Sequence, residues 1–297
     1  MEERTYAAAG VSLATADSVV ERLRAAVEST GAAGFGAFAG IYPLDDRNLL
    51  AASTDGVGTK LILARERGAL RACGADLAAH CINDVLTTGA APLFLLDYVA
   101  ANRISLDEIA ELVDGAAEVC RAAGVALLGG ETAELPGIYR DGELDFAGTC
   151  VGIVDRERLV DGSAIREGDV VVGFPSAGVH ANGFTLVRRV LQEEDYTGDD
   201  LLAPTRLYLE QVHALDIPHG LAHITGGGIE GNLGRIVPDG LRAEIDWESW
   251  ERPPVYHWLA RHVEEGELRR VFNLGIGFCA VAPRPADGRV IGRIVAA

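Results

Sequence analysis

Lysine is nearly absent from this 297-residue chain, in which Lys60 is the only lysine beside twenty-five arginines. Arginine serves equally well where only charge matters, whereas a compact, rotatable ammonium suits a contact such as a phosphate oxygen. Lys60 ends the segment STDGVGTK, residues 53–60, whose acid, hydroxyl and glycine residues suit a polyphosphate and its metal. The composition therefore marks Lys60 as a candidate phosphate contact, with chance survival of one lysine as the alternative.

Positive charge is scarce as a whole, and the formal net charge is -18. Nonspecific nucleic-acid binding needs clustered positive charge, so this composition argues against a nucleic-acid partner. No basic-then-apolar leader opens the chain, and no apolar run approaches the roughly 20 residues that cross a bilayer. We therefore expect a cytoplasmic protein with no membrane partner.

Paired cysteines are also lacking. The number of cysteines is odd, they form no CxxC pair, and no group of His and Cys residues has the spacing of zinc ligands. We expect buried, unpaired thiols at Cys73, Cys81, Cys120, Cys150 and Cys279.

Apolar strand-like segments alternate with helical patterns along the whole chain, which predicts a layered α/β fold. The length favours two domains, and the charged, turn-rich stretch 155–169 suggests a boundary that gives domains 1–158 and 159–297. We expect strands near 48–54, 92–101, 125–128, 146–154, 170–174, 277–282 and 290–295. Helices are expected near 15–29 with Thr15 as cap, 59–67, 73–88, 105–123 with a capping box at Ser105, 183–193 and 206–214, with one or two more between 255 and 272.

The expected helix 73–88 carries polar residues three and four positions apart, which places them on one face. These are Asp76, His80, Asn83, Asp84 and Thr87. A solvated surface is the ordinary interpretation of such a stripe. Because Asn and Asp are mediocre helix formers, a ligand at Asn83 and Asp84 is the alternative.

Several glycine-containing or acidic segments suit an anionic ligand: 55–60, 83–84, 129–134 and 225–228. Glycine leaves backbone amides free to cradle phosphate, and the carboxylates of Asp55, Asp84 and Glu131 are candidate Mg²⁺ ligands. Residues 53–60 are not a Walker A loop, because Thr59 precedes the lysine and Leu61 follows it. The glycine-rich stretch 31–40 could lie against a ligand or serve as a linker.

The segment 175–183, PSAGVHANG, places His180 beside hydrogen-bond donors just before a helix. Such a histidine could act as a general acid or base or as an anion donor, and a structural histidine is the alternative.

Six segments in order resemble the phosphoribosylformylglycinamidine cyclo-ligase (AIR synthetase) family. They are STDGVGTK at 53–60, CIND at 81–84, PLFLLDY at 92–98, GGETAE at 129–134, PSAGVHANG at 175–183 and HITGGG at 223–228. The resemblance implies two α/β domains per subunit, with the N-terminal sheets of two subunits closing into a barrel across a homodimer.

The resemblance also implies an activity: ATP-dependent, Mg²⁺-assisted ring closure of formylglycinamidine ribonucleotide (FGAM) to aminoimidazole ribonucleotide (AIR), releasing ADP and phosphate. Phosphorylation of an amide oxygen would create a leaving group that the tethered amidine nitrogen displaces. A non-catalytic nucleotide-binding paralogue, acting as an interaction or regulatory subunit, is the alternative.

By similarity, two residues would serve catalysis, Lys60 and His180, and three would bind the metal, Asp55, Asp84 and Glu131. ATP would contact Gly34, Gly36, Asp55, Gly56, Gly58, Thr59, Lys60, Asn83, Asp84, Gly129, Gly130 and Glu131. The substrate would contact Ser176, His180, Asn182, Thr225, Gly226 and Gly227.

The sequence departs from the family in several places, among them the stretch before the first glycines and the C-terminal end. The stretch 29–33 is short and carries no basic residue, and only residues 283–289 stand where the family has a helix near the C-terminus. Seven residues cannot cover a sheet face, so we expect one face of the C-terminal sheet to be more exposed or covered by another chain.

Overall fold

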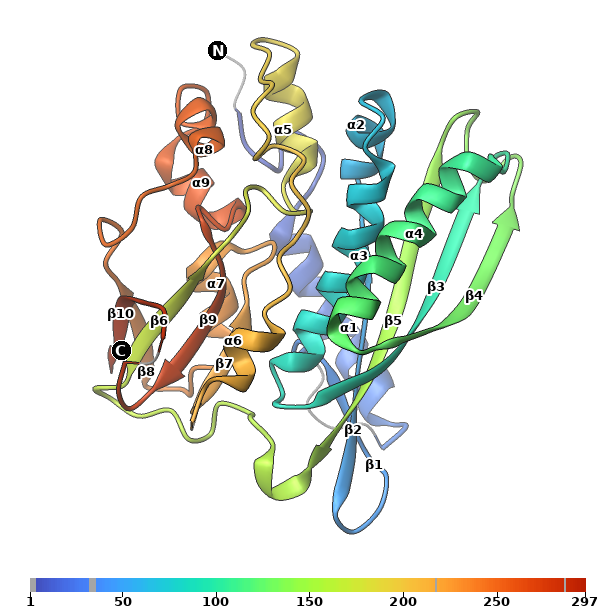
Figure 1. The fold of residues 1–297 in the computed structure, drawn as a ribbon. Helices are drawn as coiled ribbons and strands as arrows, with labels where there is room; N and C mark the ends of the chain where they lie inside the picture. The colour runs from blue at the N-terminus through green and yellow to red at the C-terminus, as the bar shows by residue number, and fades with distance from the viewer. Residues whose placement is uncertain (1–3, 32–35, 217, 286) are drawn as a thin grey trace.

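The computed structural model describes residues 4–31, 36–216, 218–285 and 287–297. It contains two five-stranded sheets, one in each half of the chain, with helices packed beside them (Figure 1). The predicted α/β class with two domains is thereby confirmed. None of the helices in the described ranges is long and apolar enough to cross a membrane.

The N-terminal half begins with α1 (Leu13–Glu28) and continues with β1 (Gly40–Pro43), β2 (Asn48–Gly56), α2 (Lys60–Glu66), α3 (Leu70–Leu86), β3 (Ala91–Ala101), α4 (Leu106–Ala123), β4 (Ala126–Glu134) and β5 (Leu144–Asp155). Its sheet has the order β1-β2-β5-β3-β4. Along β5, buried and partly exposed residues alternate, as in a strand with one covered face. Helices α3 and α4 cover that face, and α3 also contacts the C-terminal half (Figure 1).

The C-terminal half follows a short 3₁₀ turn (Arg156–Arg158) and contains β6 (Val170–Pro175), α5 (Phe184–Leu191), α6 (Leu209–His213), β7 (Gly220–His223), α7 (Gly228–Gly234), β8 (Leu241–Ile245), α8 (Pro254–Leu259), α9 (Glu265–Val271), β9 (Ile276–Ala282) and β10 (Arg289–Ala296). Its sheet has the order β7-β9-β6-β10-β8. Every residue of β9 is buried, because both faces of this strand are covered.

Most predicted elements are confirmed within a few residues, and the differences concern ends and short pieces. The N-cap of α1 is Ser12, whose hydroxyl accepts from the Thr15 amide, so the prediction of Thr15 as cap is wrong. Ser105 precedes α4 as predicted but makes no capping side-chain bond. The short elements β1, β7, α7 and β8 were not predicted, since four to seven residues carry little periodicity.

The outer face of β10 carries exposed side chains. Val290 is 41% exposed, and Arg293 pairs with Glu244 of the neighbouring β8 on the surface. The described residues between β9 and β10 contain no helix. All five cysteines are free and buried, as predicted.

Candidate active site

The polar stripe of α3 is buried where the two halves meet, so the interpretation as a solvated surface is wrong. The exposed fractions are 0% for Asp76, 3% for His80, 0% for Asn83, 8% for Asp84 and 5% for Thr87. A polar group is buried at low cost only when it has partners. The partners of this stripe come from both halves of the molecule.

Asp84 joins the halves through a histidine. One carboxylate oxygen lies 2.9 Å from Nδ1 of His223, which ends β7, and the other accepts from the Ser53 hydroxyl on β2 at 3.0 Å. Burial lowers the pKa of His223 below its ordinary value, although hydrogen bonding to Asp84 opposes this shift. The side chain of Asp84 is 12% exposed and retains lone pairs for a further ligand.

Asp55 forms a second carboxylate–imidazole pair beside the first. Its Oδ2 lies 3.2 Å from Nδ1 of His80, and its Oδ1 accepts from the Gly56 amide. Burial acts to lower the pKa of His80, but the hydrogen bond and charge of Asp55 outweigh it and raise that pKa; the pKa of Asp55 is lowered. The rings of His80 and His223 meet edge to face with centroids 5.0 Å apart.

The two aspartates fit a hard cation. The side chain of Asp55 is 35% exposed. It is followed by Gly56 and Gly58, and Gly58 has a left-handed backbone with a φ of 68°. Carboxylate oxygens are the ligands that Mg²⁺ prefers, and imidazoles that orient them are common neighbours of such sites. The structure thus brings together two of the three predicted metal ligands.

Glu131 is not brought to this cluster within one chain. Asp55 pairs with Gly148 on β5, Gly148 with Asp97 on β3, and Asp97 with Gly130 on β4, so three strand spacings of about 4.8 Å separate β2 from β4. Glu131 pairs with Tyr98, and its strand position alternates to the face that α3 and α4 leave uncovered. No group of three His, Cys, Asp or Glu side chains in the described ranges could hold a metal.

The segment 129–134 belongs to β4, although the sequence predicted that it follows a strand. A Cβ on Gly130 would lie 1.8 Å from the Asp97 carbonyl oxygen, so glycine permits close strand pairing here. Gly129 and Gly130 are exposed at the sheet edge. Within a single chain they form no cradle beside Asp55.

Lys60 is wholly buried and its ammonium has protein partners in three directions. Nζ lies 2.6 Å from Asp76 Oδ2 and donates to the carbonyls of His180 at 2.7 Å and Ala203 at 3.1 Å. An ammonium has three N–H donors, so this geometry leaves none for a phosphate. Its neighbour Thr59 also reaches the C-terminal half, where its hydroxyl lies 3.0 Å from that of Thr185.

His180 is turned inward and is 1% exposed. Its backbone has a φ of 64°, unusual for a residue other than glycine, and Nε2 accepts from the Ala177 amide at 3.2 Å. Burial, with positive neighbours including Lys60, holds the pKa of His180 well below its ordinary value. This geometry does not favour His180 as a proton carrier, because its imidazole is buried and its Nε2 already accepts a hydrogen bond from the protein.

The loop that contains His180 is held from behind by Asn273. The Asn273 amide nitrogen donates to the carbonyls of Gly178 and Val179, and its oxygen accepts from the hydroxyls of Ser176 and Tyr256. Ser176 is therefore buried and already bonded. A substrate would meet the loop's other end, where Asn182 is half-buried.

The loop of residues 225–228 lies next to Asn182, since a Cβ on Gly226 would be 3.6 Å from the Asn182 side-chain oxygen. Asn232 of α7 fixes this loop by donating to the carbonyls of Thr225 and Gly228. The structure thus assembles Asn182, Thr225, Gly226 and Gly227 on the C-terminal half, as expected for a shared ligand surface.

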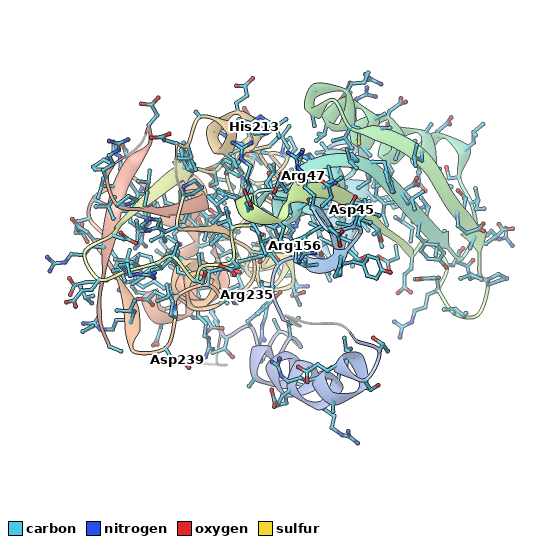
Figure 2. The ribbon with its side chains drawn as sticks, turned by 90° about the horizontal axis from the view of Figure 1, so that it is seen from below. Asp45, Arg47, Arg156, His213, Arg235 and Asp239 are labelled. Atoms are coloured by element: carbon cyan, nitrogen blue, oxygen red, sulfur yellow. The ribbon has the colours of Figure 1, made fainter. Side chains whose placement is uncertain are left out.

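Arg235, which follows α7, ties the glycine-rich stretch to the C-terminal half. Its guanidinium donates to the Gly36 carbonyl and lies 3.9 Å from the ring centroid of Phe38. Figure 2 shows Arg235 between the two halves, on the side seen from below. Burial lowers the pKa of Arg235, and the charges of Asp84 and Asp55 oppose this shift. Gly34 lies outside the described residues.

Two family models together match most of the chain. AIR synthase related protein, N-terminal domain, matches residues 36–154, and AIR synthase related protein, C-terminal domain, matches residues 166–294. The phosphoribosylformylglycinamidine cyclo-ligase of Synechococcus sp. (strain CC9605) is 47% identical over 311 residues, covering 96% of this chain and 90% of that protein. The chain belongs to the phosphoribosylformylglycinamidine cyclo-ligase family.

Other cyclo-ligases are almost as similar. The enzyme of Sorangium cellulosum (strain So ce56) is 46% identical, covering 97% of this chain and 90% of that protein. The chloroplastic cyclo-ligase of Arabidopsis thaliana is 44% identical, covering 97% of this chain and 77% of that protein. The family resemblance that the six segments predict is confirmed.

Solved structures share the cyclo-ligase fold at low identity. AaThiL complexed with AMPPCP and TMP has a TM-score of 0.69 at 17% identity, covering 93% of this chain and 90% of that chain. PurL of T. maritima complexed with ADP has a TM-score of 0.61 at 21% identity, covering 89% of this chain and 43% of that chain. The first structure contains an ATP analogue and the second contains ADP.

Several residues that build this cyclo-ligase site carried no assigned role in the sequence. Asp76 and His80 belong to the predicted stripe, His223 belongs to a matching segment, and the sequence assigns no role to Asn273 or Arg235. The signal that could have singled them out is their residue type, because buried polar side chains in mostly apolar segments need partners. Their partners lie up to 199 positions away in sequence, which no local pattern indicates.

Proposed function

We propose that this chain catalyses the ATP-dependent cyclisation of FGAM to AIR, with release of ADP and phosphate, in purine biosynthesis. The observation that carries the proposal is the pair of carboxylates, Asp55 and Asp84, held by histidines beside the loops of the C-terminal half. Identity of 44–47% to cyclo-ligases over most of the chain supports it.

In the proposed site, Asp55 and Asp84 would hold Mg²⁺ and, through it, the phosphates of ATP. The cation would neutralise phosphate charge, which is the main requirement of phosphoryl transfer beyond positioning. His80 and His223 orient the two carboxylates through their Nδ1 atoms, while the glycines beside Asp55 keep the approach open.

The C-terminal loops would bind the ribonucleotide. Asn182 and Thr225 offer hydrogen-bonding side chains, and Gly226 and Gly227 let the substrate approach the backbone closely. Asn273 and Asn232 hold these loops in place before any substrate binds. Fixed orientation matters here, because ring closure joins two groups of one molecule and gains from alignment.

We also propose a homodimer formed by the uncovered face of the N-terminal sheet. Leu96 and Tyr98 of β3 lie on that face and are 42% and 37% exposed, and Tyr42 of β1 is 68% exposed. Apolar side chains at this density favour a partner surface. Since Glu131 lies on the same face, its carboxylate would reach a bound metal only across such an interface.

A cytoplasmic location remains part of the proposal. Five unpaired, buried cysteines suit a reducing compartment. The acidic composition is compatible with it and carries no further weight.

The assay is direct. Purified protein given FGAM, ATP and Mg²⁺ should release one phosphate for each AIR formed, and neither product should appear when FGAM or ATP is omitted. Measurable ATP binding with no AIR would contradict the proposal and favour the non-catalytic paralogue.

A further inference from the structure

Lys60 and Asp76 connect the two halves of the molecule through buried charge. Both residues belong to the N-terminal half, and both side chains are 0% exposed. The carbonyls that accept from the Lys60 ammonium, those of His180 and Ala203, belong to the C-terminal half. A charged group therefore sits directly on the boundary between the halves.

Asp76 extends the same connection. Its second carboxylate oxygen accepts from the amide and the hydroxyl of Thr205, at 2.8 and 2.7 Å. About two helical turns further along α3, the Asn83 side chain donates to the Arg206 carbonyl and accepts from the Tyr208 amide. Residues 203–208 are thus fixed along the polar face of α3.

Lys60 contacts the loop of residues 176–183 at His180, whose backbone has a left-handed conformation. A left-handed backbone is costly for a residue other than glycine and persists only where neighbours hold it. Lys60 binds the carbonyl of that same residue, and the Tyr208 hydroxyl donates to Pro175, just before the loop. The loop conformation therefore depends on contacts with α2, α3 and residues 203–208.

We infer that Lys60 and Asp76 are positioning residues that hold the 176–183 loop in its substrate-binding shape against the N-terminal half. This role replaces a phosphate contact for Lys60, and its kinetic readout rests on the proposed function. We call the Lys60–Asp76 pair and its bonds to His180, Ala203 and Thr205 the clamp. It acts on the loop that carries Asn182, while Asp55 and Asp84 are held by other partners. Loss of the clamp should therefore affect FGAM more than ATP.

The test compares Lys60→Met, Asp76→Asn and the double variant in the full-length protein. Each single variant should raise the KM for FGAM by about tenfold or more, with the KM for ATP nearly unchanged, because small displacements of positioning groups are costly. The double variant should be little worse than the worse single variant, since both changes break one shared connection. Thr205→Val, which removes one hydroxyl donor to Asp76, should give a smaller change in the same direction.

Leu112→Ala is the matched control, because Leu112 is fully buried in α4, away from the junction. It should lower the melting temperature while leaving the KM for FGAM unchanged. The inference is overturned if Lys60→Met weakens ATP binding while Asp76→Asn leaves both KM values unchanged, which is the result expected of a phosphate contact.

A second measurement keeps the two proposals separable and serves for a variant too unstable for kinetics. Hydrogen exchange of the amides in residues 176–183 should be faster in Lys60→Met, Asp76→Asn and Thr205→Val than in the wild type, and unchanged in Leu112→Ala. If the wild type makes no AIR, the proposed function fails. The hydrogen-exchange comparison would still show whether Lys60 and Asp76 hold the loop. Unchanged exchange in all of the clamp variants would refute it.

Discussion

Three buried histidines have pKa values shifted in different directions because their immediate neighbours differ. His80 faces the carboxylate of Asp55 and has a raised pKa, whereas burial lowers the pKa of His223 despite its bond to Asp84. His180 has no carboxylate partner, and its pKa is lowered most clearly. Residue type alone gives none of these differences.

His180 should make stability depend on pH. The unfolded histidine ionises near pH 6.5, whereas the folded one ionises only at lower pH, so acidification protonates the unfolded state first. The free energy of unfolding should therefore fall as pH drops below 6.5, by up to about 1.4 kcal/mol per pH unit from this group. Urea unfolding between pH 5 and 7.5 should show a shallower fall for His180→Asn, because asparagine tolerates the left-handed backbone without titrating.

The comparison with wild type is essential, because the raised pKa of His80 acts in the opposite direction. A group with a raised folded pKa adds stability as pH falls below that value. The difference between the two proteins removes this contribution. Parallel curves for wild type and variant would contradict the assignment of a buried, neutral His180.

Asp84→Asn should abolish most of the activity while keeping the fold. Asparagine retains the size of the side chain but loses the charge that would bind Mg²⁺, and we expect kcat/KM to fall by about 100-fold. This fall in kcat/KM is measured by steady-state phosphate release. Asp114→Asn is the control, since Asp114 is exposed and pairs with Arg71 at 3.3 Å on the surface; equal losses in both variants would rule out a specific role.

At the scale of elements, α3 is the central piece of the molecule. One face packs on the N-terminal sheet, the polar stripe contacts the C-terminal half, and a third side crosses α4. The helices approach closely because glycines face each other there. A Cβ on Gly74 would lie 1.9 Å from the Leu112 carbonyl oxygen, and one on Gly115 would lie 2.0 Å from that of Arg71.

Gly74→Ala should therefore destabilise the protein even though alanine is the better helix former. Forcing the two backbones apart should cost about 1–3 kcal/mol, which exceeds the gain in helix propensity. Gly266→Ala in α9 is the control, because nothing lies within 4 Å of its added Cβ, and stability should hold or rise slightly. Urea midpoints measure both, and an unchanged midpoint for Gly74→Ala would show that the helices can separate freely.

Sequence periodicity identified α3 itself but not its surroundings. Polar residues at intervals of three and four define a face, and that geometry is local. Whether the face meets water or protein depends on residues 203–208 and 223, more than 100 positions away. The segment 129–134 is a similar case, because its glycines suit a phosphate loop and equally suit close pairing with β3.

At the scale of the whole molecule, the two sheets differ in how they are covered. The C-terminal sheet has a strand buried on both faces, whereas in the part of the chain that the structure describes α3 and α4 cover one face of the N-terminal sheet and leave the other open. A stable interface buries about 1,200–2,000 Å² in total, and a five-stranded sheet face is large enough to contribute half of that area.

Charge on the uncovered face should therefore dissociate the proposed dimer. Leu96→Glu or Tyr98→Glu should yield monomers in sedimentation velocity experiments at micromolar concentration, with wild type sedimenting as a dimer. Val290→Glu is the control, because Val290 is as exposed as Leu96 but lies on the C-terminal sheet. A monomeric wild type, or dissociation only by Val290→Glu, would contradict the assignment of this face.

The sequence by itself determined the family, the α/β class, most element positions and the segments that make the site, because these follow from local pattern and matching motifs. Only the tertiary structure decided that Glu131 lies apart from Asp55 and Asp84, that His180 faces inward, and that Lys60 is held by three protein oxygens. The reason is that burial and partnership are set by residues distant in sequence. The single lysine correctly indicated a position that needs an ammonium, but the partners of this ammonium are oxygens of the protein itself.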